Sequence, residues 1–389
     1  MKKKPDILKI SHIITGLSTG GAEIMLLKLI SGMDKTLFSN SVISLTKPGD
    51  MEKNFINAGI PTASLNLSPA FLNPLALLRL IFLLRKEKPD IIQGWMYHAN
   101  IASTAGSYIS GLFTPVLWNI RSCLDEADKD KTPPKRIIKL SSRLSRSPAA
   151  IIYNSRMSKE QHRQISFNNK KAEYIPNGFN CLQFTPNSES RLQYRNKFGI
   201  SDKTICIGLI ARYHPVKDHE NFLRAAELLT QNYFDLCFVL IGKDADWQNG
   251  AMASIINELN IRKKILPLGK QNNIHKLINI LDIAVSSSYI EGFSNAIGEA
   301  MASCIPCVVT DVGDSAYLVK DTGLIVPPRN PYKLYKALKR IINMGKEERS
   351  KLGKKARKKI EDNFSLEHIV EQYQKLYRKI IYQNYPIQK

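Results

Sequence analysis

The sequence has no run of roughly 18 uninterrupted apolar residues, which excludes a transmembrane helix. It is also short of acidic side chains: 34 Asp and Glu residues stand against 56 Lys and Arg residues, and the formal net charge is +22. Such an excess favours a polyanionic partner, which means nucleic acid, an anionic membrane face or a phosphorylated substrate. The apolar content of 43% is otherwise that of a soluble globular protein, and 389 residues suffice for two domains.

Cysteine is scarce as well, and its placement argues against a disulfide framework. The six cysteines are scattered along the chain, mostly within apolar strand-like runs, as expected of reduced thiols that act as small apolar side chains. Cys304 and Cys307 form a Cys-x-x-Cys pair, but no second ligand pair and no thiolate-stabilising helix start accompanies them. We therefore interpret both as structural.

A secretory signal is missing too. The N-terminal stretch MKKKPDILKISHIITGL begins with lysines and continues with an apolar run. However, Asp6, Lys9 and His12 interrupt that run, and no small-residue cleavage site follows it. The stretch is better interpreted as a first β-strand, so we expect a cytoplasmic protein.

What the chain does contain is a regular alternation of strand-like and helix-like segments. Apolar runs typical of buried strands occupy 7–14, 41–46, 90–95, 115–120, 149–154, 204–211, 235–242, 282–288 and 305–311. Amphipathic, helix-length segments lie between them, for example 22–33 and 73–86. This alternation predicts parallel sheets with helices on both faces. A polar stretch near 178–203 divides it into two Rossmann-like halves that we expect to face one cleft, and 365–381 is one more helix.

Two of the helical segments carry a possible membrane function. The segment 73–86 has Arg79 inside an apolar run, and we interpret it as a crossover helix that packs on the core, with a membrane-surface helix as the alternative. The segment 133–146 interleaves an aliphatic stripe with Lys and Arg, which suits an anionic lipid surface. A solvated domain helix explains the second segment equally well.

Ligands of open parallel sheets bind beyond the carboxyl ends of the strands, so the residues after each strand matter most. Gly20 and Gly21 follow the first strand ahead of a helix, where backbone N–H groups can approach a phosphate, although glycine pairs often only make a turn. Arg212 and Lys217 follow the first strand of the second half. Two cations above a strand end suit a diphosphate.

The stretch YIEGFSNAIGEAMA (289–302) places two carboxylates around a helix start. N–H groups of the helix start, from Gly292 to Asn295, including Phe293 and Ser294, can point at a phosphate. Glu291 and Glu299 would repel that phosphate unless they face neutral hydroxyl groups. The spacing therefore suggests a nucleotide-sugar, with one carboxylate on the ribose and the other on the hexose.

These residues resemble a known family. Glu-x7-Glu after a strand, ARYHPVKDHENFLRA before it, GGAE near the start and IPNGFN at 175–180 are similar to the group 1 (family 4) retaining glycosyltransferases, over roughly residues 8–378. The resemblance implies an α/β GT-B fold with two Rossmann-like parallel-sheet domains facing a central cleft. The first would span 1–180, with a C-terminal helix (365–384) packed back on it, and the second, 181–364, would bind the donor.

The resemblance also implies roles for single residues. Glu299 would hold the ribose hydroxyls and Glu291 the donor sugar, while Arg212 and Lys217 would hold the diphosphate. Gly20, Gly21 and the amides from Phe293 to Asn295 would assist, and Lys270 in LPLGK would lie beside the nucleobase. No metal or other cofactor is expected, because the two cations neutralise the departing diphosphate. That phosphate is thought to accept the acceptor's proton, so a general base is not required.

The first half departs from the family at one point. Family members often carry His-x-His on the fourth strand, whereas this sequence has IIQGWMYHAN, with His98 just past the strand. His98 is a candidate catalytic residue facing the donor hexose, and a helix N-cap is the rival interpretation. Arg121, at the end of the fifth strand, would hold an acceptor phosphate or pair with Asp125. Asn177 and Gly178 are interpreted as a hinge turn.

We therefore expect an enzyme that moves a hexosyl or N-acetylhexosaminyl group from a nucleotide-sugar, most commonly UDP-linked in the family, with retention. The acceptor would be a saccharide, for instance a polyprenyl-diphosphate saccharide in surface-polysaccharide, O-antigen or capsule assembly at the inner face of the cytoplasmic membrane. The alternatives are a nucleotide-sugar epimerase of the same architecture and a non-catalytic nucleotide-sugar sensor. A nucleic-acid-binding protein is disfavoured, because no aromatic residues interleave with the basic run at 133–146.

Overall fold

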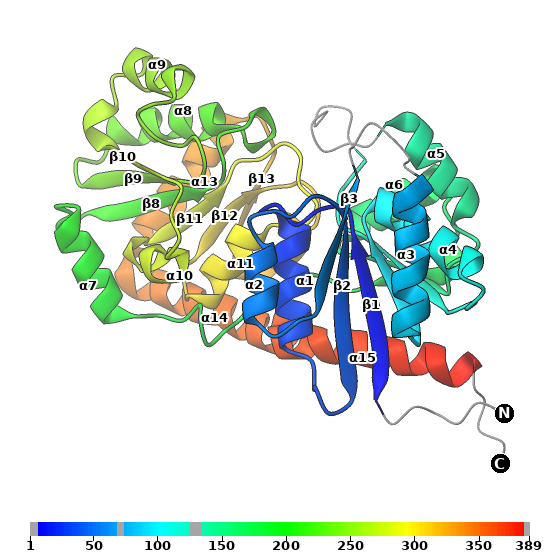
Figure 1. Ribbon diagram of the computed structural model, residues 1–389. Helices are drawn as coiled ribbons and strands as arrows, with labels where there is room; N and C mark the ends of the chain where they lie inside the picture. Colours follow the sequence, from blue (N-terminus) through cyan, green and yellow to red (C-terminus); the bar gives the residue numbers. More distant parts are fainter. Residues whose placement is uncertain (1–6, 68–73, 125–133, 385–389) are drawn as a thin grey trace. The chain divides into compact units, whose positions relative to one another are not determined.

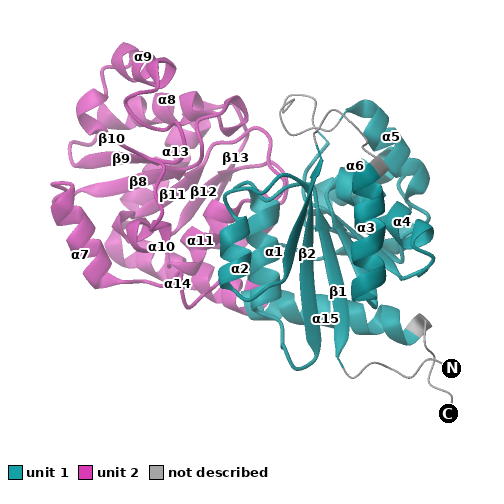
Figure 2. Ribbon diagram, in the orientation of Figure 1, with its two compact units in different colours: residues 1–178, 366–389 teal, residues 179–365 magenta. Residues whose placement is uncertain are grey.

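The computed structural model describes residues 7–67, 74–124 and 134–384, and the chain divides into two compact units. Unit 1 comprises residues 1–178 and 366–389, and unit 2 comprises residues 179–365 (Figure 2). Each is built from strands that alternate with helices around a parallel sheet (Figure 1). The two parallel Rossmann-like sheets expected from the sequence are thereby confirmed.

In the described part of unit 1 the sheet has seven strands, in the order β3-β2-β1-β4-β5-β6-β7. The strands are β1 (Leu8–Ile14), β2 (Phe38–Thr46), β3 (Thr62–Leu67), β4 (Ile91–Trp95), β5 (Val116–Ile120), β6 (Ala150–Tyr153) and β7 (Ala172–Tyr174). The α-helices are α1 (Gly21–Ser31), α2 (Glu52–Asn57), α3 (Pro74–Glu87), α4 (Tyr97–Ile109), α5 (Lys135–Leu144), α6 (Arg156–Gln164) and α15 (Leu366–Asn384), and a 3₁₀ turn η1 covers Asn169–Lys171.

The central strands of this sheet are buried on both faces, which explains their continuous apolar sequences. On one face, α1 and α15 cover an apolar cluster that includes Ile10, Leu29 and Tyr377. On the other face, α3 and α4 cover a second cluster, which includes Leu84 and Trp118. The chain therefore returns from unit 2 to complete the core of unit 1 with its last helix.

In the described part of unit 2 the sheet has six strands, in the order β10-β9-β8-β11-β12-β13. The strands are β8 (Ile205–Ile210), β9 (Leu236–Ile241), β10 (Ile265–Gly269), β11 (Ile283–Ser286), β12 (Cys307–Thr310) and β13 (Gly323–Val326). The α-helices are α7 (Ser188–Lys197), α8 (His219–Thr230), α9 (Gly250–Glu258), α10 (Ile274–Leu277), α11 (Asn295–Ala302), α12 (Ser315–Val319), α13 (Pro331–Asn343) and α14 (Gly345–Phe364). The 3₁₀ turns are η2 (Pro215–Lys217), η3 (Arg262–Lys264), η4 (Ile278–Ile280) and η5 (Lys320–Thr322).

Candidate functional site

The carboxyl ends of β8 and β11 are neighbours in the sheet of unit 2, since the two strands pair in parallel. Arg212 and the turn η2 follow β8, and the loop that carries Glu291 follows β11. Two hydrogen bonds fix η2 against this loop: the hydroxyl of Ser287 donates to the carbonyl of Lys217 (2.9 Å), and the amide of Tyr289 donates to the carbonyl of Val216 (3.0 Å). The topology thus brings two distant candidate segments together.

The contact that results is an ion pair between Nζ of Lys217 and Oε2 of Glu291. Both side chains are largely buried, so the pair is less screened by water than a surface ion pair. The sequence analysis assigned Lys217 to a diphosphate and Glu291 to a sugar. The structure places the two groups in direct contact, and their ligand roles stay predictions.

The loop after Glu291 is held from its other side by the turn that follows β12. The amide of Asp314 donates to the carbonyl of Gly292 (2.8 Å). Gly313 has φ +57°, and a Cβ on it would lie 2.1 Å from the carbonyl oxygen of Glu291. Only glycine fits this position, and its close packing fixes the position of the Glu291 backbone.

The side chains of Phe293 and Ser294 are buried, which restricts what they offer to a ligand. Phe293 stacks on Phe179, with 6.1 Å between the ring centroids, and also contacts Phe364. The ring therefore anchors the start of α11 in the core of unit 2. Any contribution of Phe293 to an anion comes from its backbone N–H group, as the sequence analysis expected.

Helix α11 begins at Asn295, directly behind this loop, and its first turn directs N–H groups toward the carboxyl edge of the sheet. Gly298 packs so closely on Phe179 that a Cβ there would lie 2.0 Å from the ring. The buried face of α11 is thereby fixed, and Glu299, the next residue, is half-buried one turn into the helix. The positive end of the helix dipole and the two carboxylates lie around one short segment.

Arg212 is held by backbone contacts on both of its sides. The amide of Ala211 donates to the carbonyl of Ile241 (2.8 Å), and the amide of Tyr213 donates to the carbonyl of Lys243 (2.8 Å). Gly242, with φ +156°, permits this approach, because a Cβ on it would lie 2.1 Å from the carbonyl oxygen of Ala211. Arg212 is half-buried at the edge that also carries Lys217.

Lys270 occupies a more distant place on the same edge. It follows β10, which is separated from β11 by β9 and β8 in the strand order. The amide of Gly242 donates to the carbonyl of Gly269 (2.9 Å), so Lys270 is connected to the β9 loop. Its role beside a nucleobase stays a prediction.

Arg329 is a cation of this region that the sequence analysis missed. Its guanidinium carbon lies 4.0 Å from the ring centroid of Tyr289, two residues before Glu291. Burial raises the pKa of the nearby Asp218, and the charge of Arg329 opposes this rise. The signal was available, since Arg329 follows a strand (β13) just as Arg212 does, but two prolines intervene.

In unit 1, His98 is the second residue of α4 and lies beyond the end of β4. The residue that caps this helix is Met96, with φ +70°, so the rival interpretation of His98 as an N-cap is wrong. His98 is exposed, and partial desolvation of its ring lowers its pKa. The histidine is therefore available to a ligand, while its catalytic role stays a prediction.

Within the residues that the structure describes, Arg121 contacts neutral side chains of unit 1. It donates to the side-chain oxygens of Asn177 and Asn119 and to the hydroxyl of Tyr373, and its guanidinium lies 5.5 Å from the ring centroid of Trp95. Burial lowers its pKa. A buried cation whose contacts are neutral is suited to an anionic ligand.

Two neighbouring expectations bear on this network. Asp125, the alternative partner of Arg121, lies outside the described residues. Asn177 precedes the boundary between the units, as expected of a hinge, but its buried side chain also accepts a hydrogen bond from Arg121.

The N-terminal start of α1 differs from what a phosphate site would require. Gly20 is the N-cap in an extended conformation, and a Cβ on it would lie 2.5 Å from Oε2 of Glu23. The carboxylate of Glu23 thus lies at the helix start that Gly20 and Gly21 were expected to offer to an anion. A phosphate there would have to displace it.

Residues 7–67, 74–124 and 134–384 contain neither a metal-binding cluster nor a membrane-spanning helix. Within these ranges no group of three His, Cys, Asp or Glu side chains is arranged to hold a metal ion. No helix in the same ranges is long and apolar enough to cross a bilayer. Burial raises the pKa of both Cys304 and Cys307, so these thiols are protonated.

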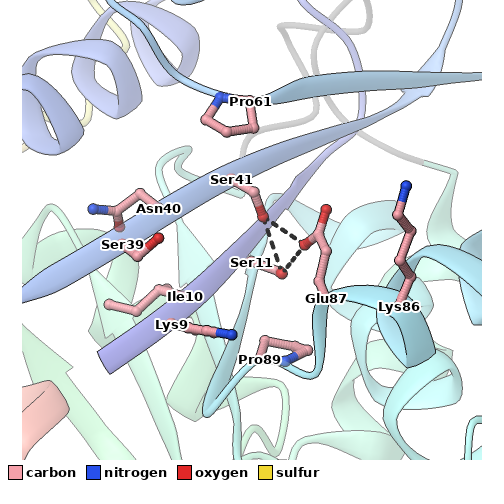
Figure 3. A pocket seen from close by; sticks show the side chains of 10 residues that line it. All are labelled: Lys9, Ile10, Ser11, Ser39, Asn40, Ser41, Pro61, Lys86, Glu87 and Pro89. Carbon is pink, nitrogen blue, oxygen red and sulfur yellow. Dashed lines mark hydrogen bonds between the residues drawn. The ribbon is translucent and has the colours of Figure 1, made fainter. Parts of the chain in front are cut away.

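A cavity of about 290 Å³ lies at the opposite, amino-terminal edge of the unit 1 sheet (Figure 3). Its floor is formed by Glu87, whose Oε2 accepts hydrogen bonds from Ser11 (2.6 Å) and Ser41 (2.7 Å). These bonds tie the end of α3 to β1 and β2. The carboxylate thus has a structural role, and parallel sheets bind ligands at their other edge.

Comparison with known proteins agrees with this geometry. Residues 190–359 match the family model described as glycosyl transferases group 1, and residues 19–181 match that of glycosyltransferase family 4. The putative glycosyltransferase EpsF of Bacillus subtilis is 23% identical over 318 residues, 78% of this chain and 79% of that protein. The UDP-Gal:alpha-D-GlcNAc-diphosphoundecaprenol alpha-1,3-galactosyltransferase of Escherichia coli is 24% identical over 323 residues, 82% of each chain.

Solved structures resemble the chain over nearly its whole length. HepE of Anabaena, crystallised with UDP, superposes with a TM-score of 0.84 at 18% identity and covers 96% of this chain and 100% of its own. The sucrose-phosphate synthase of Thermosynechococcus elongatus gives a TM-score of 0.78 at 18% identity, with coverage of 97% and 100%. These similarities show the GT-B fold. The two family models and the curated relatives show that the chain is a transferase enzyme and belongs to the group 1 glycosyltransferases.

Proposed function

We propose that this protein transfers a hexosyl or N-acetylhexosaminyl group from a UDP-sugar to a lipid-linked saccharide, with retention of configuration. The observation that carries the proposal is the ion pair of Lys217 and Glu291 beside the start of α11. A cation and a helix N-terminus suit a diphosphate, and an adjoining carboxylate suits sugar hydroxyls. This is the arrangement that a nucleotide-sugar requires.

The catalytic contribution of these groups is electrostatic. As the bond between the sugar and the diphosphate breaks, negative charge grows on the leaving phosphate. Arg212, Lys217 and the N–H groups at the start of α11 stabilise that charge without a metal ion. Loss of one such donor costs about 3 kcal/mol of barrier. Glu291 and Glu299 hold the hexose and the ribose.

UDP is the proposed nucleotide because relatives and structural neighbours use it. The name of the Escherichia coli relative specifies a UDP-galactose donor, and HepE has been crystallised with UDP and with UDP-glucose. The same relative acts on a diphosphoundecaprenol-linked acceptor, and a Campylobacter jejuni relative, 27% identical over 182 residues, also bears a diphospho-undecaprenol acceptor in its name. A lipid-linked acceptor in cell-surface polysaccharide synthesis is therefore proposed here.

In unit 1, we assign Arg121 to a phosphate of the acceptor and His98 to the donor hexose. The described network around Arg121 supports the first role, because the side chains named in it are neutral and a phosphate would supply a negative charge. The basic helix α5 exposes Lys135, Lys139 and Arg143, which supports a peripheral position on the anionic inner face of the cytoplasmic membrane.

A thermal-shift panel of nucleotides and nucleotide-sugars tests the donor. The wild type should be stabilised by UDP-sugars more than by GDP-sugars, and Glu299→Ala should abolish the response. Glu347→Ala, on an exposed residue of the same unit, serves as the control and should respond like the wild type. Indifference of the wild type to every nucleotide would contradict the proposal.

The products separate the proposal from its rivals. An epimerase releases a free altered sugar without an acceptor, and a sensor releases nothing. A transferase forms a new glycoside, and its anomeric proton coupling in NMR reports whether configuration is retained. Inversion would overturn the proposed mechanism while leaving the donor assignment intact.

A further inference from the structure

Helix α3 has a buried face and an exposed face, and both are apolar. Leu80 and Leu84 lie in the core beneath the helix. Leu78 and Phe82, which lie one turn apart on the outer face, are 60% and 65% exposed. The expectation that this helix packs on the core therefore holds for one face, and the other face presents large apolar side chains to solvent.

The end of α4 continues this exposed surface. Tyr108, Ile109 and Phe113 are 56%, 52% and 70% exposed, and the rings of Tyr108 and Phe113 meet edge to face at 6.0 Å. Phe113 has φ +50°, a left-handed conformation that is unfavourable for a bulky residue. In this conformation the ring of Phe113 remains in solvent.

The two exposed groups belong to one surface because α3 and α4 are in close contact (Figure 1). A Cβ on Gly106 of α4 would lie 2.9 Å from Leu84 of α3. Nearer the surface, Nε of Arg85 donates to the carbonyl of Ser110 (2.9 Å). An apolar patch of this kind on a monomer marks an interaction site.

Cations flank the apolar side chains of the patch on α3. Arg79 and Lys86 follow Leu75 and Phe82 by one turn on α3, so cations flank the apolar side chains. Helix α5 packs against α4 and adds three more exposed cations, Lys135, Lys139 and Arg143. The acidic residues of 75–124 and 134–149 are Glu87 and Asp90. Glu87 accepts hydrogen bonds from the hydroxyls of Ser11 and Ser41. Asp90 accepts one from the amide of Lys9.

We propose that the outer face of α3 and the end of α4 insert into the interfacial layer of a bilayer that contains anionic phospholipid. Exposed Leu, Phe and Tyr side chains bury apolar area between the headgroups, and flanking Arg and Lys side chains remain at the phosphates. The proposal assigns the insertion to α3 and α4, and the basic α5 serves as an electrostatic neighbour. Its biological reason rests on the proposed function, because a lipid-linked acceptor lies in a membrane.

Vesicle sedimentation at low and high salt tests the insertion directly. Leu78→Ser with Phe82→Ser should lower binding to phosphatidylglycerol–phosphatidylcholine vesicles about tenfold at both salt concentrations. Lys139→Gln with Arg143→Gln should lower it at low salt, where the electrostatic attraction acts. Leu182→Ser with Phe234→Ser is the control, because both side chains are 85% exposed on unit 2. Equal loss in this control, or unchanged binding of the α3 variant, would overturn the proposal.

Fluorescence distinguishes insertion from mere adsorption. Trp95 and Trp118 are fully buried, but Trp247 of unit 2 is 38% exposed, so the introduced tryptophan of Phe82→Trp is read in a Trp247→Phe background. Its emission should shift to shorter wavelength on vesicles, and that of Phe234→Trp should not. A wild type that sediments as a dimer, and as a monomer after Leu78→Ser with Phe82→Ser, would show that a second copy covers this face and would overturn the proposal.

The two proposals fail separately. Nucleotide binding of the α3 variant should equal that of the wild type, since α3 carries none of the donor-binding residues. A wild type that binds vesicles through α3 but no UDP-sugar would refute the proposed function alone. A wild type that binds UDP-sugars but leaves vesicles unaffected would refute the membrane surface alone.

Discussion

Lys217 and Glu291, 74 residues apart, form an ion pair at the carboxyl edge of the unit 2 sheet. In the proposed donor complex, a diphosphate oxygen would compete with this carboxylate for the ammonium group. The same carboxylate would lie beside a bound diphosphate and repel it. Under the proposed function, the carboxylate therefore weakens the binding of a nucleotide alone. It contributes to binding only when the nucleotide carries a sugar.

Glu291→Gln should separate these two effects. Without the competing carboxylate, affinity for UDP alone should rise about fivefold, a gain of roughly 1 kcal/mol. Turnover of the UDP-sugar should fall about a hundredfold, because a contact that acts in the transition state is lost. Calorimetry and initial rates measure the two quantities, with Glu347→Gln as the control. A fall in UDP affinity would show that Glu291 does not oppose the nucleotide.

Gly313→Ala should damage the site without touching a ligand. The new methyl group meets the carbonyl oxygen of Glu291, whereas at Gly345, which has φ +77°, nothing lies within 4 Å of a new Cβ. Both alanines carry the strain of a positive φ, about 1 kcal/mol, so Gly345→Ala controls for it. UDP-sugar affinity should drop about tenfold or more in Gly313→Ala only. Equal affinities in the two variants would contradict the role of the loop.

Arg121→Gln should affect the acceptor and spare the fold. Its pKa is lowered by burial, so the charge is held at a cost, and a neutral amide removes that cost. The thermal midpoint should stay the same or rise, while KM for a phosphate-bearing acceptor should increase about tenfold and KM for the donor should not change. Arg121→Lys should not restore the acceptor KM, because a bidentate contact needs the guanidinium. A fall in stability with an unchanged acceptor KM would make Arg121 structural.

Stability should decline as the pH falls from 6.5 toward 4. Burial lowers the pKa of His12, His162 and His219 to about 4 in the folded protein, while the unfolded chain has histidines near 6.5. Between these values the unfolded chain binds more protons, so acid favours it, by at most about 1.4 kcal/mol per histidine and pH unit. Stability from this source is complete above pH 6.5. Thermal midpoints across this range measure the slope.

His162→Gln isolates one histidine. His162 accepts from the hydroxyl of Tyr97 (2.7 Å) and donates through Nδ1 to the carbonyl of Ser158 (2.7 Å), which fixes the neutral tautomer. The variant should be less stable at pH 7.5 and should lose less stability on acidification than the wild type. A steeper loss in the variant would contradict the assignment of the slope to buried histidines.

The sequence predicted the interior strands and not the edges of the sheets. Buried central strands such as β4 and β8 have continuous apolar sequences, so their positions were predicted within about a residue. β3, β7, β10 and β13 were not predicted, because TASLNL and AEY are polar or short, ILPLG contains a proline and GLIV lies beside prolines. Edge strands bury one side at most and leave a weak periodic signal.

The site residues were identified one by one, but their contacts depend on the fold. The pairing of Lys217 with Glu291 follows from β8 and β11 being neighbours, which no local pattern specifies. For α3 the sequence left a core-packing helix and a membrane-surface helix open. The exposure of Leu78 and Phe82 shows that one face packs on the core and that the other face lies in solvent.

The most direct test of the account is calorimetric titration of UDP into the wild type, Lys217→Ala and Lys263→Ala. Lys263 is an exposed cation of the same unit that lies beside β10, and its removal changes the net charge equally. We predict that UDP binds the wild type and Lys263→Ala with the same affinity and binds Lys217→Ala at least thirtyfold more weakly, about 2 kcal/mol. Equal affinities for all three proteins, or no binding of UDP to the wild type, would contradict a diphosphate site at this edge of the sheet.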